Sequence, residues 1–289
     1  PGEGSSMAQG VANLSQDERM QEVLRMLETR DSVHVAELAK AFAVSEVTVR
    51  SDLGQLARQG LVARVRGGVR PLQRGQSELG FDFRLRLEVE RKQAIARAAA
   101  SMVDEGEAVA LDSSTTAYYL ALELRAKQAR VGVTNGLLIA AALADAPGIT
   151  VLVTGGMLRL HAMSLVGDLG ADVLRATRIS KGFLGARGLS LDRGLMDLNP
   201  DEVRIKREMA DACERVIGIL DGTKWHRTAL LPFVATEQVD GIVTDTSAPA
   251  EEVEAWRARD IDIVSVEPTQ RSRPAARRGL RRTRPGDEA

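Results

Sequence analysis

The sequence predicts an α/β protein with two parts: a small N-terminal unit of three helices and a β-hairpin, and a larger C-terminal domain with a mainly parallel sheet. Apolar residues recur at helical spacing in three segments before residue 60, and a short alternating run follows them. Beyond residue 80, short apolar runs alternate with helical segments, which is typical of βα units. A stretch over 71–80 that is rich in Pro, Gln, Gly and Ser predicts a linker between the two parts.

The N-terminal unit, residues 15–70, has the element order of a winged helix-turn-helix. The predicted elements are, in chain order, helices over 17–30, 35–42 and 45–59 and a hairpin that begins with 61–65 and turns at Gly67 and Gly68. Ser45 is a favourable N-cap for the third helix, and Gly60 ends that helix. Three helices followed by a small hairpin are the layout of this DNA-binding motif.

The third predicted helix is the one that would enter a DNA major groove with its N-terminal residues. Residues 45–74 contain six arginines and two acidic residues, a net charge of +4, whereas the whole chain has a net charge of −1. We therefore expect double-stranded operator DNA as a partner, although a surface helix or a protein-binding trihelical unit is the alternative. The candidate DNA-binding residues are Ser45, Glu46, Thr48, Arg50 and Ser51 on the helix, and Arg64, Arg66, Gly67 and Gly68 on the wing.

Seven apolar runs predict the strands of the C-terminal domain, which we place at residues 81–267. The runs are 108–111, 131–133, 149–153, 182–184, 216–220, 241–243 and 261–266. Ligands of parallel α/β sheets bind outside the carboxyl ends of the strands. The polar and glycine residues that follow these runs are the candidate effector-binding residues, namely Asp112, Ser113, Ser114, Thr115, Thr116, Thr134, Asn135, Gly155, Gly156, Asp221 and Lys224.

The Ser113–Thr116 stretch opens a helix, and helix N-termini bind phosphate through free N–H groups and the positive end of the helix dipole. Lys224 would add a positive charge. Each of these residue types also occurs routinely as a helix cap or in a turn. Their shared position at the strand ends indicates a phosphorylated ligand.

Other chemistry is not indicated. Neither a dinucleotide-binding glycine motif nor a phosphate-loop lysine motif is present, and His34, His161 and His226 are too dispersed for a zinc site. We expect no metal, no cofactor and no catalytic residue. The single cysteine, Cys213, excludes an internal disulfide and fits a cytoplasmic protein, and no apolar stretch is long enough to span a membrane.

The two ends of the chain lack an apolar pattern. Residues 1–14 are interpreted as a disordered start or a tag remnant. Residues 268–289 are rich in arginine, and we predict a disordered tail there.

Several motifs resemble those of the DeoR family of bacterial sugar-metabolism regulators. The DNA-binding signature of that family is similar to the stretch from Ser45 to Leu53, with Arg50-Ser51-Asp52-Leu53 at its end, and to Arg66-Gly67-Gly68. The sensor motifs are similar to 91–96, 111–116, 133–135, 154–156, 183–186 and 221–224 in the same order, and they add Gly185 to the effector-binding candidates. Ser51 and Ser114 stand where the family usually has arginine and glycine.

The resemblance implies a sensor fold similar to ribose-5-phosphate isomerase and a sugar phosphate as effector. We therefore expect a cytoplasmic repressor of carbohydrate-metabolism genes that a phosphorylated sugar releases from DNA, acting as a homodimer or homotetramer. The alternative is a sugar-phosphate isomerase or deaminase fused to a DNA-binding domain. Such enzymes need a placed carboxylate base, and residues 181–186 carry no acidic residue where those enzymes have an acidic run.

Overall fold

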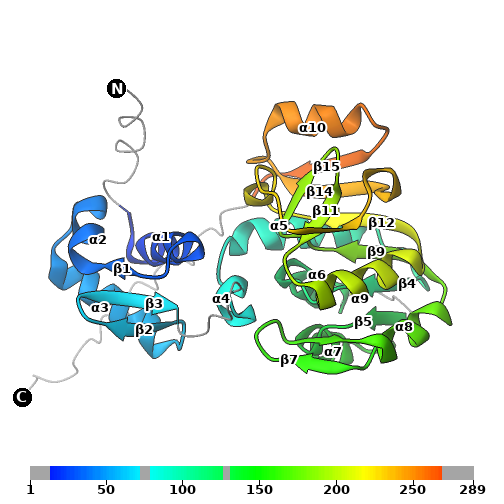
Figure 1. Ribbon diagram of the computed structural model, residues 1–289, viewed down its shortest axis with the longest axis horizontal. Helices are drawn as coiled ribbons and strands as arrows, with labels where there is room; N and C mark the ends of the chain where they lie inside the picture. The colour runs from blue at the N-terminus through cyan, green and yellow to red at the C-terminus, as the bar shows by residue number, and fades with distance from the viewer. Residues whose placement is uncertain (1–13, 72–78, 126–130, 269–289) are drawn as a thin grey trace, which may run out of the picture.

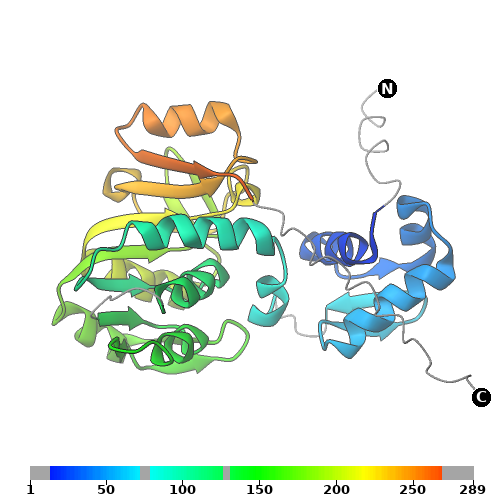
Figure 2. The ribbon, with the colours of Figure 1, turned by 180° about the vertical axis from the view of Figure 1, so that it is seen from behind.

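The computed structural model describes residues 14–71, 79–125 and 131–268. Figures 1 and 2 show a small N-terminal unit and a larger α/β domain, with one short helix between them. The described residues leave out 269–289 of the predicted tail, 1–13 at the start of the chain and most of the predicted linker.

The N-terminal unit is the predicted winged helix-turn-helix. Its elements are α1 (Gln16–Thr29), β1 (Val33–His34), α2 (Val35–Phe42), α3 (Glu46–Arg58), β2 (Val62–Val65) and β3 (Gly68–Pro71). The three strands form one antiparallel sheet in the order β1-β3-β2. The sequence did not predict β1, because a strand of two residues has no measurable periodicity.

Local signals fix the ends of these helices as the sequence predicts. The Ser45 hydroxyl accepts a hydrogen bond from the Thr48 N–H at 3.1 Å and caps α3. Gly60 after α3 and Gly67 in the wing turn have φ angles of 70° and 78°, in the left-handed region that favours glycine. A buried ion pair between Arg19 and Asp52, 2.8 Å long, ties α1 to α3.

A parallel seven-stranded sheet forms the centre of the larger domain. Its strands are β4 (Ala108–Leu111), β5 (Val131–Thr134), β6 (Thr150–Val153), β9 (Ile179–Leu184), β12 (Cys213–Ile219), β14 (Gly241–Asp245) and β15 (Asp262–Val266), in the order β15-β14-β12-β9-β4-β5-β6. All neighbours in this sheet are parallel. The seven predicted apolar runs coincide with these strands, which confirms the predicted fold class.

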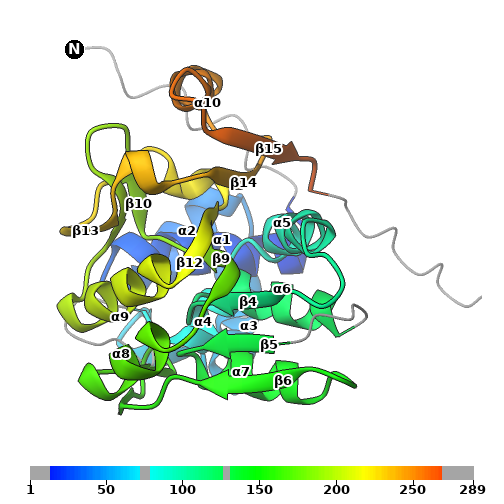
Figure 3. The same cartoon turned by 90° about the vertical axis from the view of Figure 1, so that its right-hand side faces the viewer.

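Helices cover both faces of the sheet (Figure 3). One face carries α5 (Val89–Ser101), α6 (Thr115–Leu124) and α7 (Leu137–Ala144), and the other carries α8 (Asp168–Arg175), α9 (Pro200–Asp211) and α10 (Ala250–Arg257). Each face has its own apolar core, one around Leu120 and Phe183 and the other around Met209 and Trp256. A sheet buried on both faces explains why its strands read as continuous apolar runs.

Smaller elements that the sequence did not predict complete the domain. They are the hairpin of β7 (Met157–Arg159) and β8 (Ser164–Val166), the antiparallel sheet of β10 (Gly188–Ser190), β11 (Gly194–Asp197) and β13 (Leu231–Val234), and the 3-10 turns η1 (Gly222–Lys224) and η2 (Thr236–Gln238). Strands of three or four residues are too short to show a period in the sequence.

Described residues border the stretch over 71–80 that the sequence predicts as a linker. Pro71 ends β3, Leu79 and Gly80 are buried, and α4 (Phe81–Leu85) follows them. Phe81 packs in the core of the sheet domain, whereas Phe83 packs in the core of the N-terminal unit. Helix α4 therefore joins the two cores.

Candidate functional site

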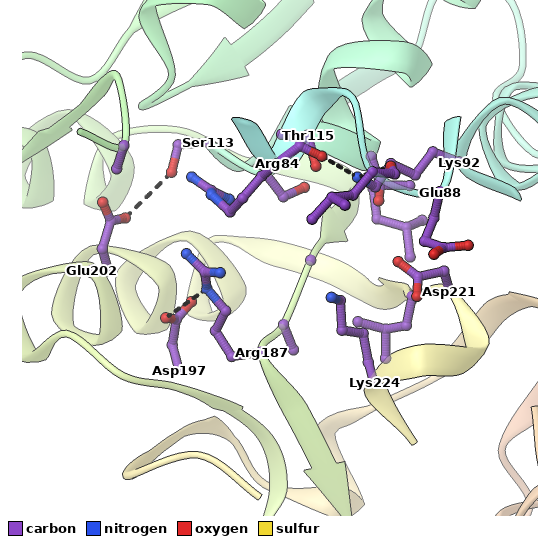
Figure 4. A pocket seen from close by; sticks show the side chains of 18 of the residues that line it. Arg84, Glu88, Lys92, Ser113, Thr115, Arg187, Asp197, Glu202, Asp221 and Lys224 are labelled. Atoms are coloured by element: carbon purple, nitrogen blue, oxygen red, sulfur yellow. Dashed lines mark hydrogen bonds and ion pairs between the residues drawn. The ribbon is translucent and has the colours of Figure 1, made fainter. Parts of the chain in front are cut away.

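A cavity opens at the carboxyl ends of β4, β9 and β12, where Ser113, Gly185 and Asp221 lie (Figure 4). Strands β5 and β6 follow β4 in sequence and lie on one side of it in the sheet, whereas the next strand of the sheet, β9, pairs with the other side of β4. The strand order thus reverses between β4 and β9, and such a reversal is where α/β sheets bind ligands. The space between the lining residues is 690 Å³, a value that includes the open solvent at the mouth of the cavity.

The N-terminus of α6 forms one wall of the cavity. Ser113, Ser114, Thr115 and Thr116 all line it, and Ser114 caps the helix by accepting a hydrogen bond from the Ala117 N–H at 3.1 Å. The N–H groups of the first helical turn have no acceptor within the helix. These N–H groups and the threonine hydroxyls can therefore bind an anion.

A buried lysine forms the floor of the site. The Lys206 ammonium lies 3.0 Å from Asp112 and 2.7 Å from Asp197, and it donates to the Gly185 carbonyl at 2.9 Å. Burial alone would raise the pKa of Asp197, but the charges of Lys206 and Arg187 lower it to about 2. The Asp197 carboxylate is therefore ionised at neutral pH.

Gly185 has a steric reason to be glycine. A Cβ atom there would lie 2.5 Å from the Ser114 Cβ, so a side chain would push the end of β9 away from the start of α6. Its N–H donates to Asp112 at 3.0 Å. Gly185 thus lets the two walls of the cavity approach each other.

Glu202 of α9 also lines the cavity, and its carboxylate already has three partners. It accepts hydrogen bonds from Ser113 at 3.3 Å and from the Ser164 hydroxyl, and it pairs with Arg159 at 2.6 Å. This network connects α6, the β7–β8 hairpin and α9. We assign Glu202 to the support of the cavity wall.

Two lysines face the cavity beside α6. Lys92 donates to the carbonyls of Arg84 and Leu87 at 2.5 and 2.6 Å, and burial lowers its pKa to about 7. Lys224 has no ion-pair partner within 4 Å in the part of the chain that the structure describes. Burial would raise the pKa of Asp221, but Lys224 and Lys92 lower it. Figure 4 shows both lysines and Asp221 on the same side of the cavity.

The structure brings together seven of the twelve predicted effector residues. The seven that line the cavity are Ser113, Ser114, Thr115, Thr116, Gly185, Asp221 and Lys224. Asp112 lies beneath them and holds Lys206. The other four lie at the ends of β5 and β6 and do not line the cavity, namely Thr134, Asn135, Gly155 and Gly156.

Several cavity residues were not found from the sequence. Those are Glu28, Arg84, Glu88, Lys92, Arg187, Asp197, Glu202 and Lys206. They lie in helices, in a short strand or in the bends before α5 and β10, where the sequence gives no signal that distinguishes them from solvated surface residues. The nearest signal is the stretch 91–96, which the family resemblance had already singled out.

Most of the predicted DNA-binding residues are exposed at the start of α3 and on the wing. Ser45, Glu46, Arg50, Ser51, Arg64, Arg66 and Gly67 are exposed, Thr48 is half-buried and Gly68 is buried. Arg50 pairs with Glu46 at 2.5 Å. Val47 was not predicted, yet its side chain is 74% exposed at the start of α3, where an apolar group can contact a thymine methyl.

Across residues 14–71, 79–125 and 131–268, no group of three or more His, Cys, Asp or Glu side chains is placed to hold a metal ion. The same residues contain no helix that is long and apolar enough to cross a membrane.

Family models match both parts of the chain. A DeoR-like helix-turn-helix domain matches residues 19–74, and a DeoR C-terminal sensor domain matches residues 87–246. The fold and its two surfaces define a DNA-binding transcriptional regulator with a ligand-sensing domain. The protein belongs to the DeoR family of transcriptional repressors, which confirms the resemblance of its motifs.

Curated relatives and solved structures are similar to this chain. The transcriptional regulator GolR of Listeria innocua is 32% identical over 79% of this chain and 90% of its own length. The glycerol-3-phosphate regulon repressor of Escherichia coli is 28% identical over 82% of this chain and 93% of its own. Ribose 5-phosphate isomerase A of Neisseria gonorrhoeae matches 46% of this chain and 52% of its own, with a TM-score of 0.34 and 16% identity.

Proposed function

We propose that this repressor controls carbohydrate-metabolism genes and that a phosphorylated sugar, bound in the cavity at the strand ends, releases it from its operator. The observation that carries the proposal is the position of the α6 N-terminus, with Thr115 and Thr116, beside Lys224 and Lys92 in one cavity. These groups suit a phosphate. The engaged carboxylates around them suit sugar hydroxyls, which can donate to their remaining lone pairs.

A relative supports the ligand class. The Escherichia coli relative is a repressor of the glycerol-3-phosphate regulon, and glycerol 3-phosphate is a phosphorylated polyol. The proposal extends this kind of chemistry to the present cavity. We propose a cytoplasmic protein, in keeping with the single cysteine Cys213 and with a function on operator DNA.

The arrangement of the carboxylates favours ligand sensing over isomerase chemistry. A general base works best with a pKa near neutral pH and with a free lone pair facing the substrate. The pKa of Asp197 is about 2, and Glu202 accepts from two hydroxyls and one guanidinium. Neither carboxylate has the properties of a catalytic base.

The experiment that tests the proposal is an anisotropy titration of the full chain on its operator, with and without a panel of pentose and hexose phosphates. The operator can be selected from random DNA by the protein itself. We expect one or more sugar phosphates to weaken operator binding about 5- to 150-fold. Binding that no member of the panel alters would contradict the proposal.

Arg50→Ala is expected to weaken operator binding by about 1–3 kcal/mol. The Arg50 guanidinium lies one turn into α3, is exposed and is held only by the surface carboxylate of Glu46, so it can turn to a base edge. Gel-shift titration at fixed salt measures the effect. Arg178→Ala, which removes an arginine from the far surface of the sensor domain, serves as the control. Equal affinity of Arg50→Ala and wild type would place recognition elsewhere.

We expect a homodimer or homotetramer in solution. Operators of helix-turn-helix proteins have two half-sites, and a twofold-symmetric assembly presents two α3 helices to them. Light scattering at micromolar protein measures the mass. A monomeric mass with and without operator DNA would refute this expectation.

A further inference from the structure

The first helix of the DNA-binding unit reaches the effector cavity. Glu28, in the last turn of α1, lines the cavity together with residues of the sensor domain. Its carboxylate is 15% exposed and lies 3.3 Å from the guanidinium of Arg227, which follows η1 in the sensor domain. A carboxylate of one domain thus forms part of the wall of a site that belongs to the other.

A second contact fixes the same helix beside the cavity. Arg25 of α1 pairs with Glu88 at 2.5 Å, and Glu88 also lines the cavity. Glu88 has a φ angle of 49°, a left-handed conformation that is unfavourable for glutamate. Its carboxylate is only 7% exposed and is shared with Arg91 at 3.3 Å. The docked α1 therefore holds a strained residue at the cavity rim.

A cavity lysine holds the segment that joins the two cores. Lys92 donates to the carbonyls of Arg84 and Leu87 at the end of α4. The side chain of Leu87 packs in the core of the DNA-binding unit with Phe83, whereas Phe81 packs against the sensor domain. A ligand that draws the Lys92 ammonium toward itself therefore acts on the junction of the two domains.

We propose that an incoming phosphate displaces the Glu28 carboxylate from the wall of the effector cavity and so undocks α1 from the sensor domain. The inference rests on the proposed function, because it assumes that the effector carries a phosphate. Glu28 and a phosphate bound in the same cavity are two anions that repel each other, so a bound phosphate disfavours the Glu28 carboxylate in its present place.

Undocking of α1 changes the position of the recognition helix. The buried pair between Arg19 and Asp52 ties α1 to α3, so the two helices move as one body. The ligand thereby favours one arrangement of the DNA-binding unit over another, which is what a change in operator affinity requires.

The test begins with inorganic phosphate as the probe and isothermal titration of the full chain. Glu28→Gln keeps the shape of the side chain and removes the competing charge, so it should bind phosphate about three- to tenfold more tightly than the wild type. Glu37→Gln removes an equal charge from the surface of α2 in the same unit, where Glu37 pairs with Arg30, and should bind like the wild type. Equal affinity of the two variants overturns the proposal.

Hydrogen exchange of the wild type tests the displacement itself. Phosphate should speed exchange of the amides in the last turn of α1 and slow exchange in the first turn of α6. Unchanged or slower exchange in α1 overturns the proposal even if phosphate binds. Tighter binding by Glu28→Gln together with faster exchange in α1 supports it.

Failure of this inference is distinguishable from failure of the proposed function. If phosphate and the sugar phosphates all fail to bind the wild type, both are wrong. If sugar phosphates bind and weaken DNA binding while Glu28→Gln behaves like Glu37→Gln, the effector site stands and the role of Glu28 is wrong. Wild-type protein that binds sugar phosphates but not phosphate alone, with α1 exchange unchanged by either, also rejects only the role of Glu28.

Discussion

The double variant Thr115→Ala with Lys224→Ala should bind operator DNA normally and no longer respond to the sugar phosphate. Both residues line the cavity, at the α6 N-terminus and after β12, and neither lies in the DNA-binding unit. Removing the hydroxyl and the cation takes away two of the groups that we assign to the phosphate. Because allosteric coupling cannot exceed the differential binding of the ligand, a 5- to 150-fold response should disappear at ligand concentrations that saturate the wild type.

A matched control shows that the loss is specific to the cavity. Thr150→Ala with Arg178→Ala also removes one hydroxyl and one cation from the sensor domain, from exposed positions outside the cavity. This control should respond like the wild type in the same anisotropy titration. A wild-type response of the Thr115→Ala/Lys224→Ala variant would show that the phosphate binds elsewhere.

Lys206→Met should destabilise the sensor domain by about 3–5 kcal/mol. Lys206 is buried between Asp112 and Asp197, at 3.0 and 2.7 Å, so methionine would leave two carboxylates together without their cation. Unpaired buried charges of this kind account for the largest effects of single substitutions. Urea denaturation followed by circular dichroism measures the free energy of unfolding.

The surface provides the control for this effect. Arg178 is 87% exposed and pairs only with the carboxylate of Glu214, so Arg178→Met should change stability by less than about 0.5 kcal/mol. The double variant Lys206→Met with Asp112→Asn should recover part of the loss, because it removes one of the two stranded charges. A loss below about 1 kcal/mol for Lys206→Met would contradict the role given to this ion-pair network.

The layout of both domains was predictable because it depends on local patterns. The helix caps at Ser45 and Gly60 and the continuous apolar strands follow from short-range chemistry in the sequence. Helix α4 was missed because it has only five residues and follows a stretch rich in Pro, Gly and Ser. Its two aromatic residues, Phe81 and Phe83, pack in the cores of different domains. The periodicity of a single helix cannot indicate such a division.

Only part of the candidate site was predicted from the sequence. The rule that ligands bind at the carboxyl ends of parallel strands does not say which strands border the reversal of strand order. Asn135 and Gly156 follow β5 and β6, on the outer side of that reversal. There they hold the β7–β8 hairpin instead: the Asn135 amide donates to the Leu165 carbonyl at 3.3 Å. A Cβ on Gly156 would lie 2.3 Å from the Val166 carbonyl oxygen, so this glycine permits close packing of the hairpin.

The remaining cavity residues depend on contacts between distant parts of the chain. Lys206 meets Asp112 across 94 positions of sequence, and Glu28 meets Arg227 across 199. Such pairs are fixed by the topology of the sheet and by the packing of the two domains. Neither leaves a pattern in a single sequence.

Thermal stability with matched ligands tests the central claim most directly. The full chain should be melted with each sugar phosphate and with the same sugar lacking the phosphate. At about one hundred times its dissociation constant, the effector should stabilise the protein by about 2.7 kcal/mol, which raises the melting temperature by about 5–10 °C. The unphosphorylated sugar should have no effect, because it lacks the group that α6 and Lys224 bind. Equal stabilisation by both forms, or stabilisation by neither across the panel, would contradict a phosphorylated effector in this cavity.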